Sequence, residues 1–375
     1  MASRVEVTNV APEAPTDSSR AFRRRRLTGS AIVIAISAIF AGWIGLGIGG
    51  ATTVRNFDDV VTALAALTAA VLCLRASATQ HDRLRRFWLL MAAASAAWTI
   101  AEVIWGVYDV VLRTPVPIPS WADVGYLSAI PLAAAALLSH PAMHEHNRHQ
   151  ARATLDGIVV ATSLLFLSWT LVLGPLWRHS DLTSLGGIVD LAYPFGDVVM
   201  LFLVVLVMRS MKTGDRFALG CVLGGLVALA CADSTYAYLT EVGKYTTGNL
   251  VDTGWVVAYL ALALGAYCST GGATVRVARP AGSSSTLSLV VPFVPVIGAL
   301  LASAIEVALG RKLLFTDWVM AVVLTILVLA RQGLFLFDEF GPPGRLPERP
   351  VEPAFSGGSS STVASGSATS PESEP

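Results

Sequence analysis

Long apolar stretches, separated by short polar segments, account for most of this chain. Ten of them approach the roughly 20 residues that a helix needs to cross a hydrocarbon core about 30 Å thick. Each must be helical, because lipid offers no partner for exposed backbone N–H and C=O groups. The pattern therefore predicts an all-α polytopic membrane bundle of about ten transmembrane helices, with spans at 28–50, 57–75, 87–112, 121–138, 155–177, 186–208, 216–240, 250–268, 287–309 and 316–337.

Composition agrees with this prediction. Hydrophobic residues make up 54% of the chain and charged residues 14%, with a mean hydropathy of +0.63. A soluble domain carries roughly 25% charged residues, so a soluble protein is excluded. The 26 basic residues match the 26 acidic ones and are scattered over many loops, so no nucleic-acid partner is expected.

The basic residues also indicate an orientation. With the N-terminus inside, 20 of the 26 Lys and Arg residues fall on the inner side, including the run Arg23–Arg26. This asymmetry predicts a multi-pass protein of the cell membrane with both termini in the cytoplasm. We expect three regions: a disordered basic N-terminus over residues 1–26, a ten-helix domain over 27–340, and a disordered Pro/Ser/Gly-rich tail over 341–375.

Acidic residues inside the predicted spans are the most informative feature. Nine of them lie at or toward the outer side, and no Lys or Arg lies well inside a span to neutralise them. An unpaired carboxylate costs at least about 2.5–3.5 kcal/mol at the centre of a membrane helix. These groups must face the bundle interior, be protonated, or hold a cation or a cationic ligand. They are Glu102, Asp109, Asp123, Asp190, Asp197, Asp233, Asp252, Glu306 and Asp317.

Aromatic residues follow five of the acids at a spacing of three, which places both side chains on one helix face. An acidic floor with aromatic walls suits an amphiphilic or cationic ligand. Tyr259 continues one of these faces. The candidate ligand-binding residues are Glu102, Trp105, Asp109, Asp123, Tyr126, Asp190, Tyr193, Asp197, Asp233, Tyr236, Asp252 and Trp255.

Some of these residues also have structural interpretations. Aromatic side chains gather at the membrane interface in most membrane proteins. For Asp123, Asp252 and Asp317, positions near helix starts favour a capping role over ligand contact. Three deeper acids favour a functional or buried-network role, because intramembrane carboxylates are usually functional; they are Glu102, Asp197 and Asp233.

Motifs for catalysis are absent from the sequence, so we expect neither an enzyme nor a cofactor. The histidine-rich segment 140–149 has no established metal-ligand spacing and favours a solvated loop over a metal site. The segment Gly220–Gly225 resembles a GxxxG seam, which usually marks close helix contact.

Several short motifs occur in an order that resembles a known family. They are Glu102–Asp109, Pro117–Leu127, Leu155–Gly157, Asp190–Asp197, Asp233–Tyr236 and Gly248–Trp255. Together they resemble the membrane sensor region of actinobacterial diguanylate cyclase/phosphodiesterase proteins, over about residues 30–340. The resemblance implies a sensory module. In that family the segment that corresponds to Ala330-Arg331-Gln332 leads into a catalytic domain. In this chain Gly341-Pro342-Pro343-Gly344 breaks the helix, so no catalytic output domain is expected.

The sequence thus favours a sensory or regulatory membrane module that binds an extracytoplasmic ligand, a cation or a proton, at the outer acids. Ligand binding is expected to shift the third, sixth, seventh and eighth spans. The tenth would then carry the shift to Arg331–Phe340 and a cytoplasmic signalling effector. Two alternatives stay open: a proton- or cation-coupled transporter, and a structural or partner-binding membrane protein.

Overall fold

The computed structural model describes residues 17–144, 150–170, 174, 184–210, 216–270, 293–308, 310 and 315–340. Within these ranges the chain is helical and contains no strand. The α-helices are α1 (Asp17–Gly45), α2 (Ala51–Thr79), α3 (Asp82–Gly106), α4 (Trp121–Ser139), α5 (Gln150–Ser168), α7 (Leu185–Ser210), α8 (Arg216–Glu241), α9 (Asp252–Ser269), α11 (Phe293–Ala308) and α12 (Phe315–Phe340). A π-helical turn, η1 (Val107–Leu112), extends α3, and a 3-10 turn, η2 (Pro141–His144), follows α4.

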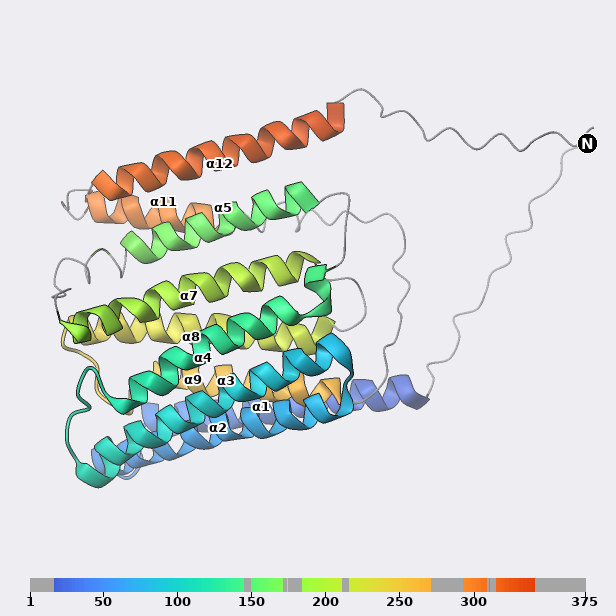
Figure 1. The fold of residues 1–375 in the computed structure, drawn as a ribbon. Helices are drawn as coiled ribbons and strands as arrows, with labels where there is room; N and C mark the ends of the chain where they lie inside the picture. The colour runs from blue at the N-terminus through green and yellow to red at the C-terminus, as the bar shows by residue number, and fades with distance from the viewer. Residues whose placement is uncertain are drawn as a thin grey trace, which may run out of the picture.

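The axes of the helices run roughly along one direction (Figure 1). Contacts between neighbouring helices close six of them into a ring. In order around the ring, α2 packs on α3, α3 on α4, α4 on α7, α7 on α8, α8 on α9, and α9 back on α2. α1 packs against α9 from outside the ring. On the far side α5 packs on α7, and α11 and α12 pack on α5. We call α2, α3, α4, α7, α8 and α9 the six-helix ring, and α5, α11 and α12 the outer trio.

Within the part of the chain that the structure describes, seven helical segments are long and apolar enough to cross a membrane, which suggests a multi-pass membrane protein. They comprise Arg20–Gly45, Ala51–Thr79, Asp82–Leu112, Trp121–Ser139, Leu185–Val207, Phe217–Thr240 and Phe315–Gly333. The ten predicted spans match the ten long helices in order. The predicted count of ten crossings goes beyond these seven, because α5, α9 and α11 do not meet the same criteria of length and composition.

Small residues let the ring helices approach closely. Alanines at the α2–α3–α4 contacts, such as Ala69, Ala94 and Ala133, are fully buried. A Cβ built on Gly225 of α8 would lie 2.8 Å from the carbonyl oxygen of Ala258 in α9. The predicted close contact at Gly220–Gly225 is therefore made by Gly225, whereas Gly220 and Gly224 face open space.

One expected boundary is wrong. Residues 17–26, expected to be disordered, form the start of α1. The arginines of this segment find partners at the end of the ring: Arg25 donates from Nη2 to Thr270 Oγ1 at 2.6 Å and lies over the ring of Tyr267. Cation–π contacts of this kind stabilise a basic segment that would otherwise remain extended in water. Residues 1–16, segment 145–149 and the tail 341–375 lie outside the described residues.

Candidate functional site

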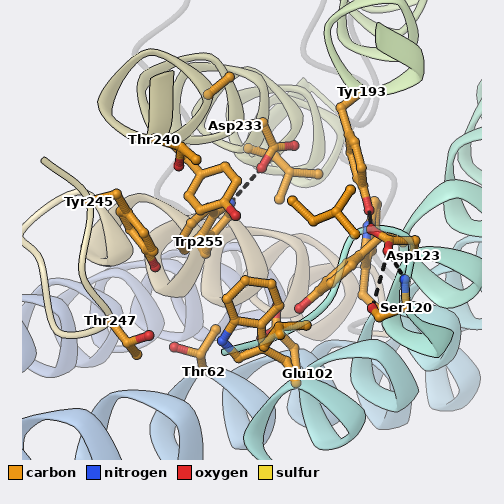
Figure 2. A pocket seen from close by; sticks show the side chains of 18 of the residues that line it. Thr62, Glu102, Ser120, Asp123, Tyr193, Asp233, Thr240, Tyr245, Thr247 and Trp255 are labelled. Atoms are coloured by element: carbon orange, nitrogen blue, oxygen red, sulfur yellow. Dashed lines mark hydrogen bonds between the residues drawn. The ribbon is translucent and has the colours of Figure 1, made fainter. Parts of the chain in front are cut away.

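A cavity of about 270 Å³ lies inside the six-helix ring (Figure 2). All six ring helices contribute to its lining, together with residues of the segments 113–120 and 242–251. These two segments connect the helices at the same end of the bundle (Figure 1). The cavity is therefore close to one end of the ring, at the side that the basic-residue asymmetry predicts to be extracytoplasmic.

Ten of the twelve candidate residues line this cavity. They are Glu102, Trp105, Asp123, Tyr126, Asp190, Tyr193, Asp197, Asp233, Tyr236 and Trp255. Asp109 and Asp252 do not line it. Of the other outward acids, Asp317 is buried in the first turn of α12, in the outer trio, and the side chain of Glu306 lies outside the described residues.

The cavity also has lining residues that the sequence interpretation missed. Asp58 and Asp59 of α2 are buried and line it, as does Tyr245 of the 242–251 segment. The two aspartates begin a predicted span but lack an aromatic three residues later, so the spacing rule passed over them. Their position at the outer end of an apolar run was the available signal.

Acids and rings are bonded between helices. Tyr193 of α7 donates its hydroxyl to Asp123 Oδ1 of α4 at 2.5 Å. The indole Nε1 of Trp255 in α9 donates to Asp233 Oδ1 of α8 at 2.6 Å (Figure 2). We call these two bonds, together with the bond between Tyr259 and Glu102 described next, the crossed acid–ring bonds.

The third crossed bond lies deepest. Tyr259 of α9 donates its hydroxyl to Glu102 Oε1 of α3 at 2.9 Å, and both residues are buried. A buried carboxylate is stabilised by such a donor. The acid-to-aromatic spacing along each helix correctly grouped these residues, but each acid takes its donor from a different helix.

The capping role expected for Asp123 is also found. Asp123 Oδ2 accepts a hydrogen bond from the backbone N–H of Ser120 at 2.6 Å, and the Ser120 hydroxyl accepts one from the N–H of Ala122. These bonds form the capping box of α4. Asp123 therefore both caps α4 and lines the cavity.

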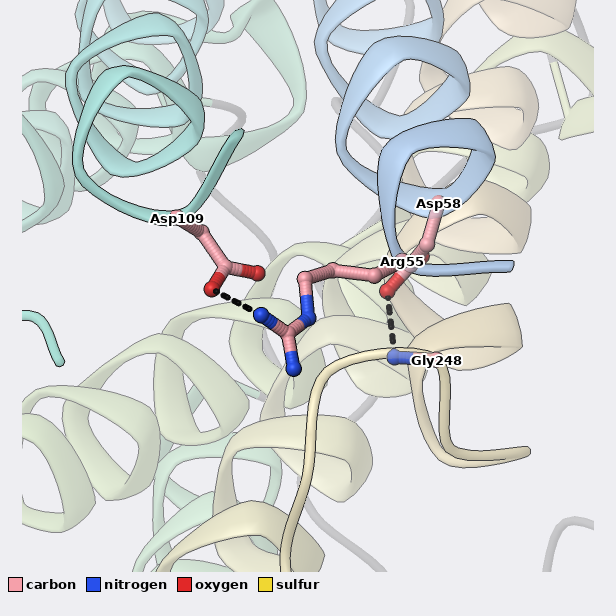
Figure 3. Close-up of polar contacts among 4 residues, drawn as sticks. All are labelled: Arg55, Asp58, Asp109 and Gly248. Atoms are coloured by element: carbon pink, nitrogen blue, oxygen red, sulfur yellow. Dashed lines mark hydrogen bonds and ion pairs between the residues drawn. The ribbon is translucent and has the colours of Figure 1, made fainter. Parts of the chain in front are cut away.

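Asp252 holds the segment before α9. Its Oδ2 accepts hydrogen bonds from the backbone N–H groups of Gly248 and Asn249, and its Oδ1 accepts one from the Tyr245 hydroxyl. The N–H of Gly248 is also within 2.9 Å of Asp58 Oδ2 (Figure 3). Burial raises the pKa of Tyr245 well above its usual value, so this phenol remains a donor.

Asp109 corrects one expectation about charge. Its Oδ1 lies 3.6 Å from Nη1 of Arg55, in the first turns of α2 (Figure 3). The expectation that no Lys or Arg neutralises the outer acids is therefore wrong for Asp109. It failed because Arg55 was placed in a loop, whereas α2 begins at Ala51 and holds this arginine beside η1.

The rings gather around Tyr236 of α8. Its ring centroid is 4.6 Å from that of Tyr245, 5.7 Å from that of Trp255 and 6.4 Å from that of Trp105, all edge-on. Among the lining residues that the structure describes there is no Lys, Arg or His. The site therefore combines acceptors with π faces, which suits a ligand that brings hydrogen-bond donors or positive charge.

Comparison with known proteins returned no matching family model, curated protein or solved structure. Over the part of the chain that the structure describes, no three His, Cys, Asp or Glu side chains are arranged to hold a metal ion.

Proposed function

We propose that this chain is a sensory or regulatory membrane module that binds a small extracytoplasmic ligand inside the six-helix ring. The carrying observation is the closure of the ring around a cavity lined by carboxylates and aromatic rings. Intramembrane ionisable groups usually mark functional sites. A convergent polar pocket of this kind is the default position for a ligand.

The family resemblance supports the same proposal. Of the six motifs that carry it, five contribute residues to the cavity: Glu102–Asp109, Pro117–Leu127, Asp190–Asp197, Asp233–Tyr236 and Gly248–Trp255. The sixth, Leu155–Gly157, lies in α5 of the outer trio. We propose on this basis that the chain is related to the membrane sensor region of actinobacterial diguanylate cyclase/phosphodiesterase proteins, and that it acts through a separate cytoplasmic effector.

Ten membrane crossings, both termini in the cytoplasm, and a place in the cell membrane complete the proposal. The Lys and Arg distribution supports this orientation. It places the segments 113–120 and 242–251, and with them the cavity, on the outer side.

We propose α9 as the helix that transmits binding across the membrane. Near the cavity it carries Trp255 and Tyr259. At its other end the carbonyl of Ser269 accepts a hydrogen bond from Gln80 Nε2 of the α2–α3 connection, and Thr270 accepts from Arg25 of α1. One helix thus connects the cavity to the basic end of the bundle.

This route replaces the one that the sequence suggested through the last helix. The described residues of α12 do not line the cavity, and α12 packs on α5 outside the ring. The main contacts between the ring and α12 run through α7 and α5. Direct contacts along α9 are the shorter path.

A thermal-shift ligand screen on the purified full chain in lipid nanodiscs tests the proposal. A ligand at 100 times its dissociation constant should stabilise the protein by about 2.7 kcal/mol. We expect Asp233→Asn to weaken this response, because the variant disturbs the Trp255 bond. Asp82→Asn, an exposed acid at the opposite end of the bundle, is the matched control.

Hydrogen exchange of residues 20–30 and 265–270 then reports transmission. Ligand-induced protection there supports α9, whereas protection confined to 315–340 would contradict it. If no ligand stabilises the protein, and Asp197→Asn and Asp233→Asn leave stability unchanged, the binding proposal is wrong. Uptake of the ligand by proteoliposomes would indicate a transporter instead.

A further inference from the structure

Two carboxylate oxygens that line the cavity have no hydrogen-bond partner in the described structure: Asp59 Oδ2 of α2 and Asp197 Oδ2 of α7. The two residues are only 7% and 9% exposed. A buried acceptor without a donor costs about 1–3 kcal/mol, and more when it is charged. Buried polar atoms in native proteins are rarely left in this state, so each oxygen indicates a donor that the chain itself does not supply.

Other carboxylates of the cavity have donors. Glu102, Asp123 and Asp233 accept the crossed acid–ring bonds, and Asp58 accepts a bond from Gly248. Within the same cavity, some carboxylates thus accept hydrogen bonds from the protein, whereas Asp59 Oδ2 and Asp197 Oδ2 accept none.

Each of these two points has a second carboxylate beside it. Asp109 lies close enough to Asp59 to share a hydrogen bond when one of the two is protonated, and Asp233 lies close to Asp197; when both members of a pair are ionised, they repel each other. A positive group at either point would offset that repulsion as well as supply the missing donor.

The two points lie on opposite sides of the ring. In the order α2, α3, α4, α7, α8 and α9, the helices α2 and α7 are three places apart in either direction. Figure 2 shows Thr62 of α2, one turn from Asp59, across the cavity from Tyr193 of α7, one turn from Asp197. One compact ion cannot contact both walls at once.

Aromatic rings stand between the two walls. Trp105, Tyr236 and Trp255 line the cavity and contact one another edge-on through Tyr236. The cavity, at about 270 Å³, is slightly smaller than most ligand sites, which span roughly 300–1,000 Å³. The fitting ligand is therefore small, with donors at both ends and an apolar middle.

We propose that the cavity binds a small aliphatic diamine, with one ammonium group at Asp59 and the other at Asp197. This inference rests on the proposed ligand-binding function and names its ligand class. Each ammonium donates to an orphaned carboxylate oxygen, and the methylene chain packs along the rings of Trp105, Tyr236 and Trp255. A divalent metal ion fits less well, because it needs six or more oxygens that converge on one point.

Calorimetric titration of the full chain in nanodiscs tests the proposal with a homologous series, from 1,3-diaminopropane to 1,8-diaminooctane. Affinity should pass through a maximum with chain length, because only one span satisfies both walls. The monoamine with the same number of carbons should bind at least about tenfold more weakly, since it leaves one carboxylate unpaired. Magnesium and calcium ions should not compete.

Asp59→Asn and Asp197→Asn test the two ends separately. Each variant should reduce the diamine affinity at least about tenfold and leave the monoamine affinity within about threefold, so that the preference for two ammonium groups disappears. Asp82→Asn should bind like the unaltered protein. If either variant fails to fold, the length series and the monoamine comparison on the unaltered chain still decide.

The outcomes separate this inference from the proposed function. Equal affinity for monoamines and diamines, no dependence on chain length, or competition by a divalent metal ion would overturn the diamine assignment. If a neutral or anionic compound stabilises the protein and amines do not, the diamine is wrong and the ligand-binding module stands. If no compound binds at all, and Asp197→Asn and Asp233→Asn leave stability unchanged, both are wrong.

Discussion

The six-helix ring and the outer trio are built from similar apolar helices but differ in what they bury. Within the described residues the ring buries Asp58, Asp59, Glu102, Asp197 and Asp252 beside its apolar core. The trio packs around a small cluster of four apolar residues, Val159, Phe166, Ala299 and Leu324, and its buried charged side chains, Asp317 and Arg331, lie on α12 outside any cavity lining that the structure describes.

Closure explains the difference. Helices in a ring face one another across an interior, so polar side chains there can find donors on other helices, as Glu102 does with Tyr259. The trio has an open edge: on α12, Phe315 is 83% exposed and Trp318 is 60% exposed. An apolar surface of this kind suits contact with lipid. The cavity and its acid–ring contacts belong to the ring, whereas α12 of the trio presents an exposed apolar surface.

Core truncation in each region should give the largest contrast. Trp88 of α3 is 1% exposed in the ring core, and Leu324 of α12 is 3% exposed in the trio core. Trp88→Ala should cost about 3–5 kcal/mol in unfolding free energy and abolish ligand binding, whereas Leu324→Ala should cost about 2–5 kcal/mol and leave ligand affinity unchanged. Denaturant unfolding in mixed micelles measures the first quantity and calorimetry the second. Loss of ligand affinity in Leu324→Ala would mean that the two regions are not separable.

Low pH should destabilise the six-helix ring through His140. This residue follows α4 and packs edge-on against Phe87 of α3. Burial lowers the pKa of His140 from 6.5 to about 4. In the unfolded chain His140 binds a proton below about pH 6.5, whereas in the folded chain it stays neutral down to about pH 4. The free energy of unfolding therefore falls as the pH drops from 6.5 to 4. The loss is at most about 3 kcal/mol.

His140→Gln should remove that component of the pH dependence, and His81→Gln, at an exposed position, should not. Thermal unfolding midpoints between pH 7 and pH 4 give the comparison. Parallel curves for the unaltered protein and His140→Gln would contradict the assignment.

Glycine replacements compare the tightness of packing. A Cβ on Gly265 of α9 would meet the carbonyl oxygen of Ala218 at 2.6 Å, so Gly265→Ala should destabilise the ring by about 1–3 kcal/mol. On Gly298 of α11 the nearest atom would be Leu167 Cδ2 at 3.8 Å, an ordinary contact. Gly298→Ala should therefore stabilise the trio by about 0.5–1 kcal/mol through helix propensity. Equal unfolding midpoints for the two variants would refute this difference.

Arg55 should show the smallest effect. It is 45% exposed, and its ion pair with Asp109 is at the rim of the ring. Arg55→Ala should cost about 0.2–1 kcal/mol, and less at high salt. Unfolding at low and high ionic strength measures the change, with Arg113→Ala, at the exposed end of η1, as the matched control. A salt-independent loss would indicate that Arg55 acts through packing.

Much of the fold followed from the sequence because lipid restricts the backbone so strongly. Helix positions were predicted in order, and the boundaries differ mainly where polar flanks continue the helix, as at Ala51 of α2. Hydropathy gives no information about which helices are neighbours, so the ring and the trio could not be predicted. Hydropathy also does not decide the number of crossings, because apolar helices such as α11 are shorter than the other spans.

The candidate site was predictable in membership but not in bonding. Depth and spacing selected ten residues that now share one cavity. They could not predict that Trp255 would bond Asp233 of another helix, because partner choice depends on packing between helices. Asp59 was missed because no aromatic residue follows it three positions later, so the spacing rule passed over it.

The crossed acid–ring bonds have an evolutionary consequence. Because Asp123 and Tyr193 stand on different helices, loss of Asp123 removes the acceptor of the Tyr193 hydroxyl, and loss of Tyr193 removes the donor to Asp123 Oδ1. The same holds for Asp233 with Trp255 and for Glu102 with Tyr259. Among proteins that descend from this chain, positions 123 and 193, 233 and 255, and 102 and 259 should covary. A sequence that keeps one residue of a pair should also keep the other.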